Sequence, residues 1–448
     1  MTVTVAGRAS RKAGLERKFD RMVPREKERR TATTAFDFGT LPEVRQLKIH
    51  RAAADLLKIE SPFFRSHEVR AAAHTVIEGR DYINFSSYDY CGLNGHPAVT
   101  AAAKEATEHF GTSVSASRVV SGERPFHREF ETALADFLGV EDAVVMVSGH
   151  ATNVTTIGHL LTKSDLVLTD AFIHNSIVEG ARLSGATRLT FRHNDLDHLE
   201  ELLSKSRHSF NRVLIAVEGL YSMDGDAPPL AKLVRLKNRY DAWLLVDEAH
   251  ALGVVGETGR GLAEREGVDP NAIEIWMGTL SKTLSSCGGF IAGSASLVEY
   301  LKATAPGFVF SVGLPPASTA AALAALKVLD AEPERVTKLA ENGQRFAEKA
   351  REAGLDIGTS EGLAVVPVIV GDSILAAVVS HRLAEAGVNV QPIIFPAVPE
   401  KAARLRFFIN STHSFDDIDR AVAATAECLK RTMNEGEGLK LLADSLNR

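Results

Sequence analysis

Five short apolar runs alternate with helical segments through the middle of the chain. Each run is rich in Val, Ile and Leu, and each ends in a small or polar residue. The runs are DAVVMVSG (142–149), DLVLTD (165–170), RVLIAVEG (212–219), WLLVDEAH (243–250) and EIWMGTLSK (274–282). Near-continuous apolar runs separated by helices are typical of parallel strands covered on both faces. The pattern therefore predicts an α/β fold with a mostly parallel sheet, and ligand-binding groups beyond the carboxyl ends of its strands.

The segments that follow these runs predict a second, smaller α/β unit. Two helical segments and a polar stretch precede the runs, and an Ala-rich helix leads into further strand-like and helical segments after them. These segments are helices at 98–110 and 128–139, the polar stretch 111–127, the Ala-rich helix 318–331, strand-like 365–372, 389–399 and 404–410, and helices at 373–387 and from Phe415.

The pattern suggests four parts in the chain. We expect a basic N-terminal extension (1–60), an N-terminal segment (61–110), a large ligand-binding domain (111–314) and a smaller C-terminal α/β domain (315–448). A chain of 448 residues exceeds one ordinary domain, so a large domain with a smaller one is the natural expectation.

Composition narrows the class of protein. Hydrophobic residues make up 45% and charged residues 24%, as in a globular enzyme. A net charge of −6 gives no electrostatic case for nucleic acid. Three scattered cysteines predict neither a disulfide framework nor a metal site, and no apolar run reaches the length of an integral membrane segment. We expect a cytoplasmic enzyme.

The first thirty residues are locally basic, with ten Lys and Arg against four Asp and Glu. One interpretation is a solvated extension, helical or partly disordered. The alternative is a docking arm for an acidic partner such as an acyl carrier protein.

Two motifs at strand ends suggest anion and ring binding. In SGHATN, Ser148 and Gly149 follow a strand and open a helix, whose N-terminus offers unpaired N–H groups to a phosphate. In VDEAH, Asp247 stands where pyridoxal phosphate (PLP) needs a carboxylate beside its pyridine nitrogen, and His250 can reach the ring hydroxyl. DEAH is also a helicase box, but that function requires a GxxxxGK[ST] loop, which the sequence lacks.

Two further strand ends could complete such a site. GTLSKT places Lys282 after an apolar strand, with Thr279 and Ser281 as candidate phosphate ligands. A lysine taken by itself is usually an exposed surface residue. Lys282, however, follows a strand-end Asp by 35 residues, and this arrangement favours a lysine that forms a Schiff base. EGLYSMDGDAPPL offers Ser222, which could instead only cap a turn.

The order of these motifs, with FIHNSIVEGA before them and RLRFFIN after them, resembles the α-oxoamine synthases over residues 60 to 430. That family includes serine palmitoyltransferase, 8-amino-7-oxononanoate synthase and 5-aminolevulinate synthase, and the residues around SGHATN resemble serine palmitoyltransferase more than 5-aminolevulinate synthase. The resemblance implies the fold-type-I PLP-dependent aminotransferase-like architecture, with a mostly parallel seven-stranded sheet. It also implies a homodimer with active sites at the subunit interface.

The resemblance also implies a role for each motif residue. Lys282 would hold PLP as a Schiff base, Asp247 would pair with the ring nitrogen, and His250 would contact the ring oxygen. His174 would stack on the ring, and Ser222 would lie near the ring oxygen and the thioester carbonyl. Further PLP contacts are expected from Ser148, Gly149, His150, Ala151, Thr279, Ser281 and Ser311, and substrate contacts from Arg406, Tyr88 and Asp89.

Several of these assignments keep an alternative. His174 could be a loop histidine with structural partners only, and His150 could contact the ring by its side chain instead of the phosphate by its backbone. Arg404 could replace Arg406 as the carboxylate ligand. Asp89 and Cys91, in SSYDYCGL, depart from the family pattern. So does SVSASR (113–118), where glycines are common, and Ser311 is followed by Val312 where the family has a second hydroxyl.

The expected activity is that of a biosynthetic C-acyltransferase. A PLP-dependent decarboxylative condensation would join glycine, alanine or serine to an acyl thioester, carried by coenzyme A or by a carrier protein, and give an α-aminoketone. The main rival is a PLP-dependent aminotransferase, which needs no thioester. A cysteine desulfurase would need a mobile cysteine, whereas Cys428 falls in an expected helix, and a non-catalytic subunit would lack Lys282.

Overall fold

The computed structural model describes residues 37–56, 60–399 and 401–435, which form two compact units. The larger unit contains residues 67–368 and 406–422. The smaller unit contains the described residues up to 66, residues 369–405 without 400, and those from 423 onward. The basic arm expected at 8–30 lies outside the described residues.

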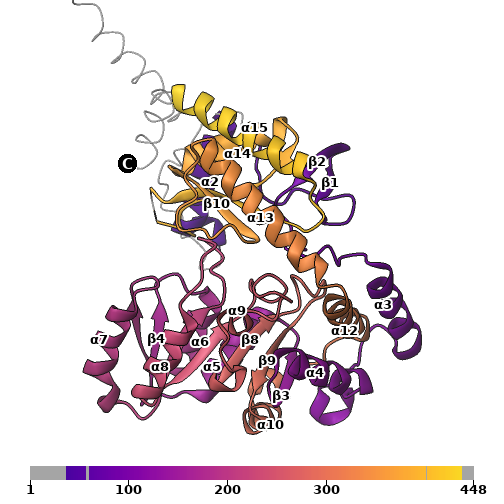
Figure 1. Ribbon diagram of the computed structural model, residues 1–448, viewed down its shortest axis with the longest axis vertical. Helices are drawn as coiled ribbons and strands as arrows, with labels where there is room; N and C mark the ends of the chain where they lie inside the picture. Colours follow the sequence, from indigo (N-terminus) through magenta and orange to yellow (C-terminus); the bar gives the residue numbers. More distant parts are fainter. Residues whose placement is uncertain (1–36, 57–59, 400, 436–448) are drawn as a thin grey trace, which may run out of the picture. The chain divides into compact units, whose positions relative to one another are not determined.

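A seven-stranded sheet forms the centre of the larger unit (Figure 1). Five adjacent strands are parallel, and β9 is antiparallel to both of its neighbours, which confirms the mostly parallel sheet. In spatial order the strands are β3 (Asp142–Met146), β9 (Gly289–Gly293), β8 (Ile275–Thr279), β7 (Trp243–Asp247), β6 (Val213–Glu218), β4 (Leu166–Asp170) and β5 (Thr187–Phe191).

The five apolar runs of the sequence are five of these strands, whereas β5 and β9 were not expected. Strand β5 is the edge strand and has the largely polar sequence TRLTF, so it gives no apolar run. Strand β9 has the sequence GFIAG, and its two glycines weaken the strand signal although all five residues are buried.

Helices cover the sheet, and both of its faces are buried. Neighbouring positions that point to opposite faces, such as Leu244 and Leu245, are both fully buried. One core cluster joins strand residues such as Leu245 and Ile291 to Ile157 of α5 (Gly149–Leu160) and to residues of α6 (Asn175–Ser184), α10 (Ala295–Thr304) and α11 (Pro306–Val309).

The remaining elements of the larger unit surround this core. They are the antiparallel pair β1 (His74–Ile77) and β2 (Arg80–Asn84), and helices α3 (Pro97–Phe110), α4 (Pro125–Leu138), α7 (Leu196–Ser206), α8 (Leu230–Arg239), α9 (Leu262–Glu266), α12 (Pro316–Ala331) and α13 (Glu334–Glu352). Helix α13 was not among the expected elements.

The smaller unit contains α2 (Pro42–Leu56), α14 (Ser373–Glu385), β11 (Val388–Asn389) and β12 (Gln391–Ile393). Strands β10 (Val365–Gly371) and β13 (Ala403–Phe408) form a three-stranded sheet with β12, and α15 (Phe415–Asn434) follows. These elements confirm the smaller C-terminal α/β unit. Within the described ranges, none of the helices combines the length and the apolar character that crossing a membrane requires.

Candidate active site

The carboxyl ends of four parallel strands bring polar side chains to one edge of the sheet. Asp170 ends β4, Glu218 ends β6, Asp247 ends β7 and Thr279 ends β8, and all four side chains are buried. Glu218 and Asp247 are direct register partners. Because these side chains are buried, any charge that they carry is weakly hydrated.

Asp247 is held in place by two hydrogen bonds. Its Oδ2 accepts a bond of 2.9 Å from the Asn153 side-chain amide, and its Oδ1 accepts one of 3.0 Å from the backbone N–H of Ala249. The carboxylate is therefore fixed from α5 on one side and from its own turn on the other.

Lys282 follows β8 by three residues and lies near Asp247. Its half-buried amine has a pKa lowered to about 8 by loss of hydration, while the charges of Asp247 and Glu218 oppose that shift. The amine lies 5.7 Å from the ring centre of Tyr88. A lysine with such a pKa has a far larger neutral, nucleophilic fraction near neutral pH than an ordinary lysine has.

His250 is buried beside the same group of charges. Its Nδ1 is 2.7 Å from the hydroxyl of Tyr90, which is fully buried. Burial, together with the cations Lys282 and Arg406, lowers the pKa of His250 well below its usual value. The ring is therefore neutral at physiological pH.

His174 and Asp247 are joined by a chain of hydrogen bonds. The Asn153 amide that binds Asp247 also donates to the Ser176 hydroxyl at 2.9 Å, and that hydroxyl lies 2.7 Å from Nδ1 of His174. The backbone N–H of Ser176 points to the same Nδ1 at 3.3 Å, so Nδ1 is an acceptor. The ring centre of His150 lies 6.3 Å from that of His174, and both side chains are exposed.

Arg406 extends from β13 over the turn after β6. Its Nη1 donates to the carbonyl of Ser222 at 3.2 Å and lies 3.5 Å from the sulfur of Met223, and the guanidinium sits 4.7 Å from the ring centre of Phe408. Its buried Nε has no hydrogen-bond partner among the described residues. Arg404, in the smaller unit, donates from Nε to the carbonyl of Ala402 at 3.0 Å.

The N-terminus of α5 and the end of β8 approach each other closely. Ser148 caps α5 by accepting a bond from the N–H of Ala151. A Cβ on Gly149 would lie 2.7 Å from Oγ1 of Thr279, which is in turn 2.8 Å from the hydroxyl of Ser281. Gly149 thus allows the N-terminus of α5 to pack closely on Thr279, and this forms a cradle of hydroxyls and helix N–H groups that suits a phosphate.

Two expected residues, Asp89 and Ser311, have other surroundings, whereas Tyr88 lies beside Lys282. Asp89 directs its carboxylate to the backbone N–H groups of Leu93 and Asn94, as a turn cap does. Tyr88 packs its ring edge on Phe408 at 4.7 Å between ring centres. Ser311 lines a small cavity with Arg118, Met146, Val147 and neighbouring residues, rather than the group around Lys282.

Sequence reasoning missed three residues of this group: Glu218, Asn153 and Tyr90. Glu218 could have been found from the sequence, because the apolar run RVLIAVE (212–218) ends in this acid. The run WLLVD (243–247) ends in Asp247 in the same way. Asn153 closes the SGHATN motif, one turn after the helix begins. Tyr90 lies on an irregular segment, and nothing in the sequence shows its proximity to His250.

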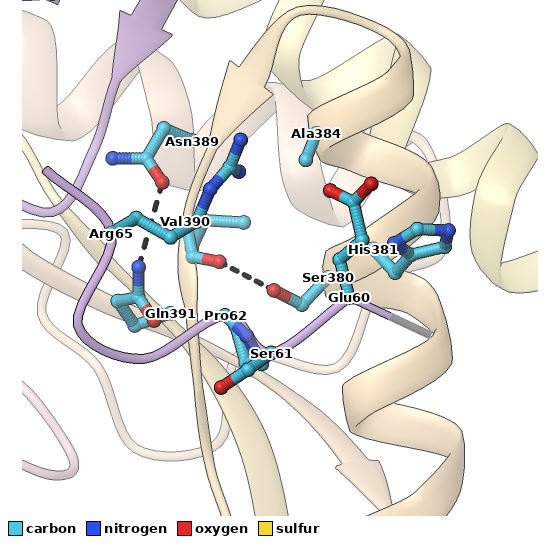
Figure 2. Close-up of a pocket in the computed structure, with 10 residues that line it drawn as sticks. All are labelled: Glu60, Ser61, Pro62, Arg65, Ser380, His381, Ala384, Asn389, Val390 and Gln391. Atoms are coloured by element: carbon cyan, nitrogen blue, oxygen red, sulfur yellow. Dashed lines mark hydrogen bonds between the residues drawn. The ribbon is translucent and has the colours of Figure 1, made fainter. Parts of the chain in front are cut away.

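A separate cavity lies in the smaller unit (Figure 2). It is lined by the segment 60–65 with side chains of α14 and of residues 389–391, and the Ser380 hydroxyl donates to the carbonyl of Val390 at 2.8 Å. None of the residues expected from the motifs lines it.

Comparison with known proteins gives a consistent family. The profile of the family Aminotransferase class I and II matches residues 80–424. The 8-amino-7-oxononanoate synthase 1 of Bacillus velezensis is 39% identical over 363 residues, which is 81% of this chain and 92% of the relative. The serine palmitoyltransferase of Sphingomonas wittichii, a solved structure, is 30% identical with a TM-score of 0.83, covering 88% of this chain and 98% of its own.

A further serine palmitoyltransferase structure, solved with PLP, is 30% identical with a TM-score of 0.80 and covers 88% of this chain and 98% of its own. The residues present here fit that group. The cradle at Gly149 brings a helix N-terminus and the Thr279 and Ser281 hydroxyls together, Asp247 offers a fixed carboxylate, and Lys282 offers an amine with a lowered pKa. The buried Nε of Arg406 is a further donor available to a ligand.

Proposed function

The chain belongs to the α-oxoamine synthase family of PLP-dependent C-acyltransferases, and from that membership we propose that its site condenses glycine, alanine or serine with an acyl thioester. The bond formed joins the Cα of the amino acid to the thioester carbonyl carbon. The thiol leaves, the amino-acid carboxylate departs as carbon dioxide, and a proton returns to Cα. The product is an α-aminoketone.

One observation carries this proposal: the buried carboxylate of Asp247 interacts with the amine of Lys282, which in turn lies within the electrostatic influence of the Arg406 guanidinium, and both cationic residues are half-buried. The amine of Lys282 has a pKa of about 8, so it can attack an aldehyde and can both accept and return a proton at Cα. PLP, when bound, withdraws electrons from Cα and so makes loss of the proton and of carbon dioxide possible.

We assign the carboxylate and imidazoles to holding that group. Asp247, fixed by Asn153, would keep the pyridine nitrogen protonated. His250 would present its free Nε2 to the ring oxygen, because Nδ1 is engaged by Tyr90. His174 would flank the ring, and Ser222 would lie near the ring oxygen and the thioester carbonyl.

Substrate recognition is assigned to Arg406. Its guanidinium already binds the Ser222 carbonyl on one side, and the buried, unpartnered Nε leaves a donor for the amino-acid carboxylate. A bidentate carboxylate contact is typical of arginine and orients the Cα–H bond as well as binding the acid. The phosphate is assigned to Ser148, Gly149, His150, Ala151, Thr279 and Ser281, which gather around the cradle.

Two parts of the proposal concern partners. We propose a homodimer, in which Ser311 contacts the phosphate of the partner's site, because Ser311 lies apart from the Lys282 group. We also propose that the thioester is carried by an acyl carrier protein, with the basic arm at 8–30 as its docking segment. Turnover with acyl carrier protein that is unchanged after deletion of residues 1–40 would refute the second part.

The decisive experiment is spectroscopic. Purified protein reconstituted with PLP should absorb in the visible, and borohydride should fix the cofactor to Lys282, as peptide mass spectrometry can establish. Glycine, alanine and serine are then titrated in turn, and the substrate is the one that shifts the spectrum. Release of free thiol and carbon dioxide on adding acyl thioesters indicates condensation, whereas an aminotransferase would give a keto acid and no thiol.

A further inference from the structure

A second cluster of charged side chains lies beside the site, and the proposed reaction does not use it. His193, in the turn after β5, is held between two carboxylates and is only 15% exposed. Its Nδ1 is 2.9 Å from Oδ1 of Asp170, and its Nε2 is 3.0 Å from Oδ2 of Asp226. Asp170 is the last residue of β4, and Asp226 lies in the connection between β6 and α8.

The geometry requires a charged ring. A neutral imidazole has one N–H and could donate to one carboxylate, whereas here both ring nitrogens face carboxylate oxygens and both must carry protons. Burial by itself would lower the pKa of His193, but the hydrogen bonds and charges of Asp170 and Asp226 outweigh it and raise the pKa to about 10. Tyr221 and Phe172 place their rings on the imidazole at 4.6 and 4.5 Å between ring centres.

The two carboxylates bind different parts of the chain. Asp170 also accepts the backbone N–H groups of Phe172 and Asn194, both at 2.8 Å, so it belongs to the fixed end of β4. Asp226 also accepts the hydroxyl of Thr359 at 2.8 Å. His193 therefore ties the connection after β6 to the sheet.

That connection is the turn on which Arg406 rests. The carbonyl of Asp226 accepts the N–H of Tyr221 at 2.8 Å, and the carbonyl of Tyr221 accepts the N–H of Gly225 at 2.9 Å, which closes residues 221–226 into a turn. The Ser222 carbonyl and the Met223 sulfur, which contact Arg406, both lie within this turn. A displacement of Asp226 would therefore move the support of the guanidinium.

We propose that His193 is a positioning residue: as an imidazolium it clamps Asp226 to Asp170, fixes the turn 221–226, and thereby sets the affinity of Arg406 for the amino-acid carboxylate. The proposal rests on the proposed function, because it takes Arg406 as the ligand of that carboxylate. His193 itself contacts neither substrate nor cofactor. It acts through the turn, and its loss should affect amino-acid binding more than the chemical step.

The first test replaces the clamp in the PLP-loaded protein. His193→Gln should lower the affinity for the amino acid about tenfold, as measured by titration of the visible spectrum. PLP content and kcat at saturating amino acid should stay within about twofold of the parent enzyme. His208→Gln, the same change at an exposed histidine, is the matched control and should leave the affinity unchanged.

The second test uses pH and does not depend on the folding of the first variant. Asp226→Asn keeps the size of the side chain but removes one of the two charges that raise the pKa of His193. The imidazole should then lose its proton at a lower pH, and amino-acid affinity in Asp226→Asn should fall as the pH rises from 6.5 to 9. The parent imidazole keeps its proton up to a pKa of about 10, so the affinity of the variant relative to the parent should fall over this range, and that ratio cancels the titration of other site groups such as Glu218 and Lys282.

The outcomes separate the two proposals. If no amino acid shifts the spectrum of the parent enzyme, the proposed function is wrong. If the parent enzyme responds, but Asp226→Asn shows the same affinity and the same pH profile as the parent, the clamp is refuted while the proposed function stands. An equal loss of PLP content and of amino-acid affinity in both variants would also refute the clamp, because it would indicate a general structural role.

Discussion

Glu218 and Asp247 lie side by side as register partners at the ends of two parallel strands, and both are almost completely buried. Burial, and the neighbouring charge of Asp247, raise the pKa of Glu218 to about 8. Asp247 accepts hydrogen bonds from the Asn153 side chain and the Ala249 N–H, whereas the backbone groups that bond Glu218, at Ser222 and His174, do not offset the burial of its charge. The two neighbouring acids therefore differ in how well their charge is stabilised.

The first prediction concerns how the free energy of unfolding depends on pH. The pKa of Glu218 is raised from 4.5 to about 8 on folding, so its contribution to stability is full below pH 4.5 and is lost as the pH rises through 8. For one proton the slope approaches ~1.4 kcal/mol per pH unit. In PLP-free protein, Glu218→Gln should therefore lose less unfolding free energy between pH 6 and 8.5 than the parent, as measured by urea denaturation.

Glu248 allows a second, independent test of the same effect. It is equally buried, and burial raises its pKa to about 8 as well, but its carboxylate accepts the N–H of Leu262 away from the lysine. Glu248→Gln should flatten the pH dependence of stability in the same way. A Glu218→Gln protein with the slope of the parent would show that Glu218 is ionised in the folded state.

The second prediction concerns the amine of Lys282 in PLP-free protein. Loss of hydration lowers its pKa to about 8 against the opposing charges of Asp247 and Glu218. Labelling of Lys282 by acetic anhydride, followed by peptide mass spectrometry, should reach half its maximal rate near pH 8. Asp247→Asn removes the larger opposing charge and should move that midpoint lower, whereas Glu248→Gln should not. A midpoint near the ordinary lysine value of 10.5 would contradict this.

The strands that carry the chemistry could be predicted because buried parallel strands have a plain apolar pattern. Asp247 and Thr279 end such runs and lie at the expected edge. Strand β5, which is polar, and β9, which holds two glycines, give no such pattern. Contacts between distant segments, such as Tyr90 with His250 or His193 with Asp226, depend on how the chain folds back. No local spacing encodes them, so sequence reasoning could not find them.

The third prediction separates the two arginines of β13. Arg406→Ala should raise the KM for the amino acid about 30- to 150-fold, because a charge-assisted pair is worth ~2–3 kcal/mol, and should leave PLP content unchanged. Arg404→Ala removes a buried side chain that bonds the Ala402 carbonyl, and it should lower thermal stability rather than amino-acid affinity. Steady-state kinetics at varied amino acid decide which arginine binds the carboxylate. The opposite result would move that role to Arg404.

The fourth prediction concerns the phosphate cradle. A methyl group at position 149 would lie 2.7 Å from Oγ1 of Thr279, closer than side-chain carbons approach. Gly149→Ala should therefore weaken the binding of PLP at least about tenfold in equilibrium dialysis, because the added methyl forces the helix N–H groups and the Thr279 hydroxyl apart. Thr279→Ser keeps the hydroxyl and is the control, and it should bind PLP within about threefold of the parent. Unchanged PLP affinity in Gly149→Ala would place the phosphate elsewhere.

The last prediction concerns the tautomer of His250. Burial raises the pKa of the Tyr90 hydroxyl well above its usual value, so that hydroxyl keeps its proton, and it is 2.7 Å from Nδ1 of a neutral imidazole. If Nδ1 carried the proton and donated it, the fully buried Tyr90 hydroxyl would have no acceptor for its own, which costs ~1–3 kcal/mol. Tyr90 therefore donates, and the proton of His250 sits on Nε2. Tyr90→Phe removes this donor, so both tautomers should become populated, and kcat should fall about twofold where the two are equally populated, because Nε2 then presents a proton only about half of the time. Nitrogen NMR of the labelled imidazole distinguishes the tautomers directly, and an Nδ1–H signal in the parent protein would overturn the assignment.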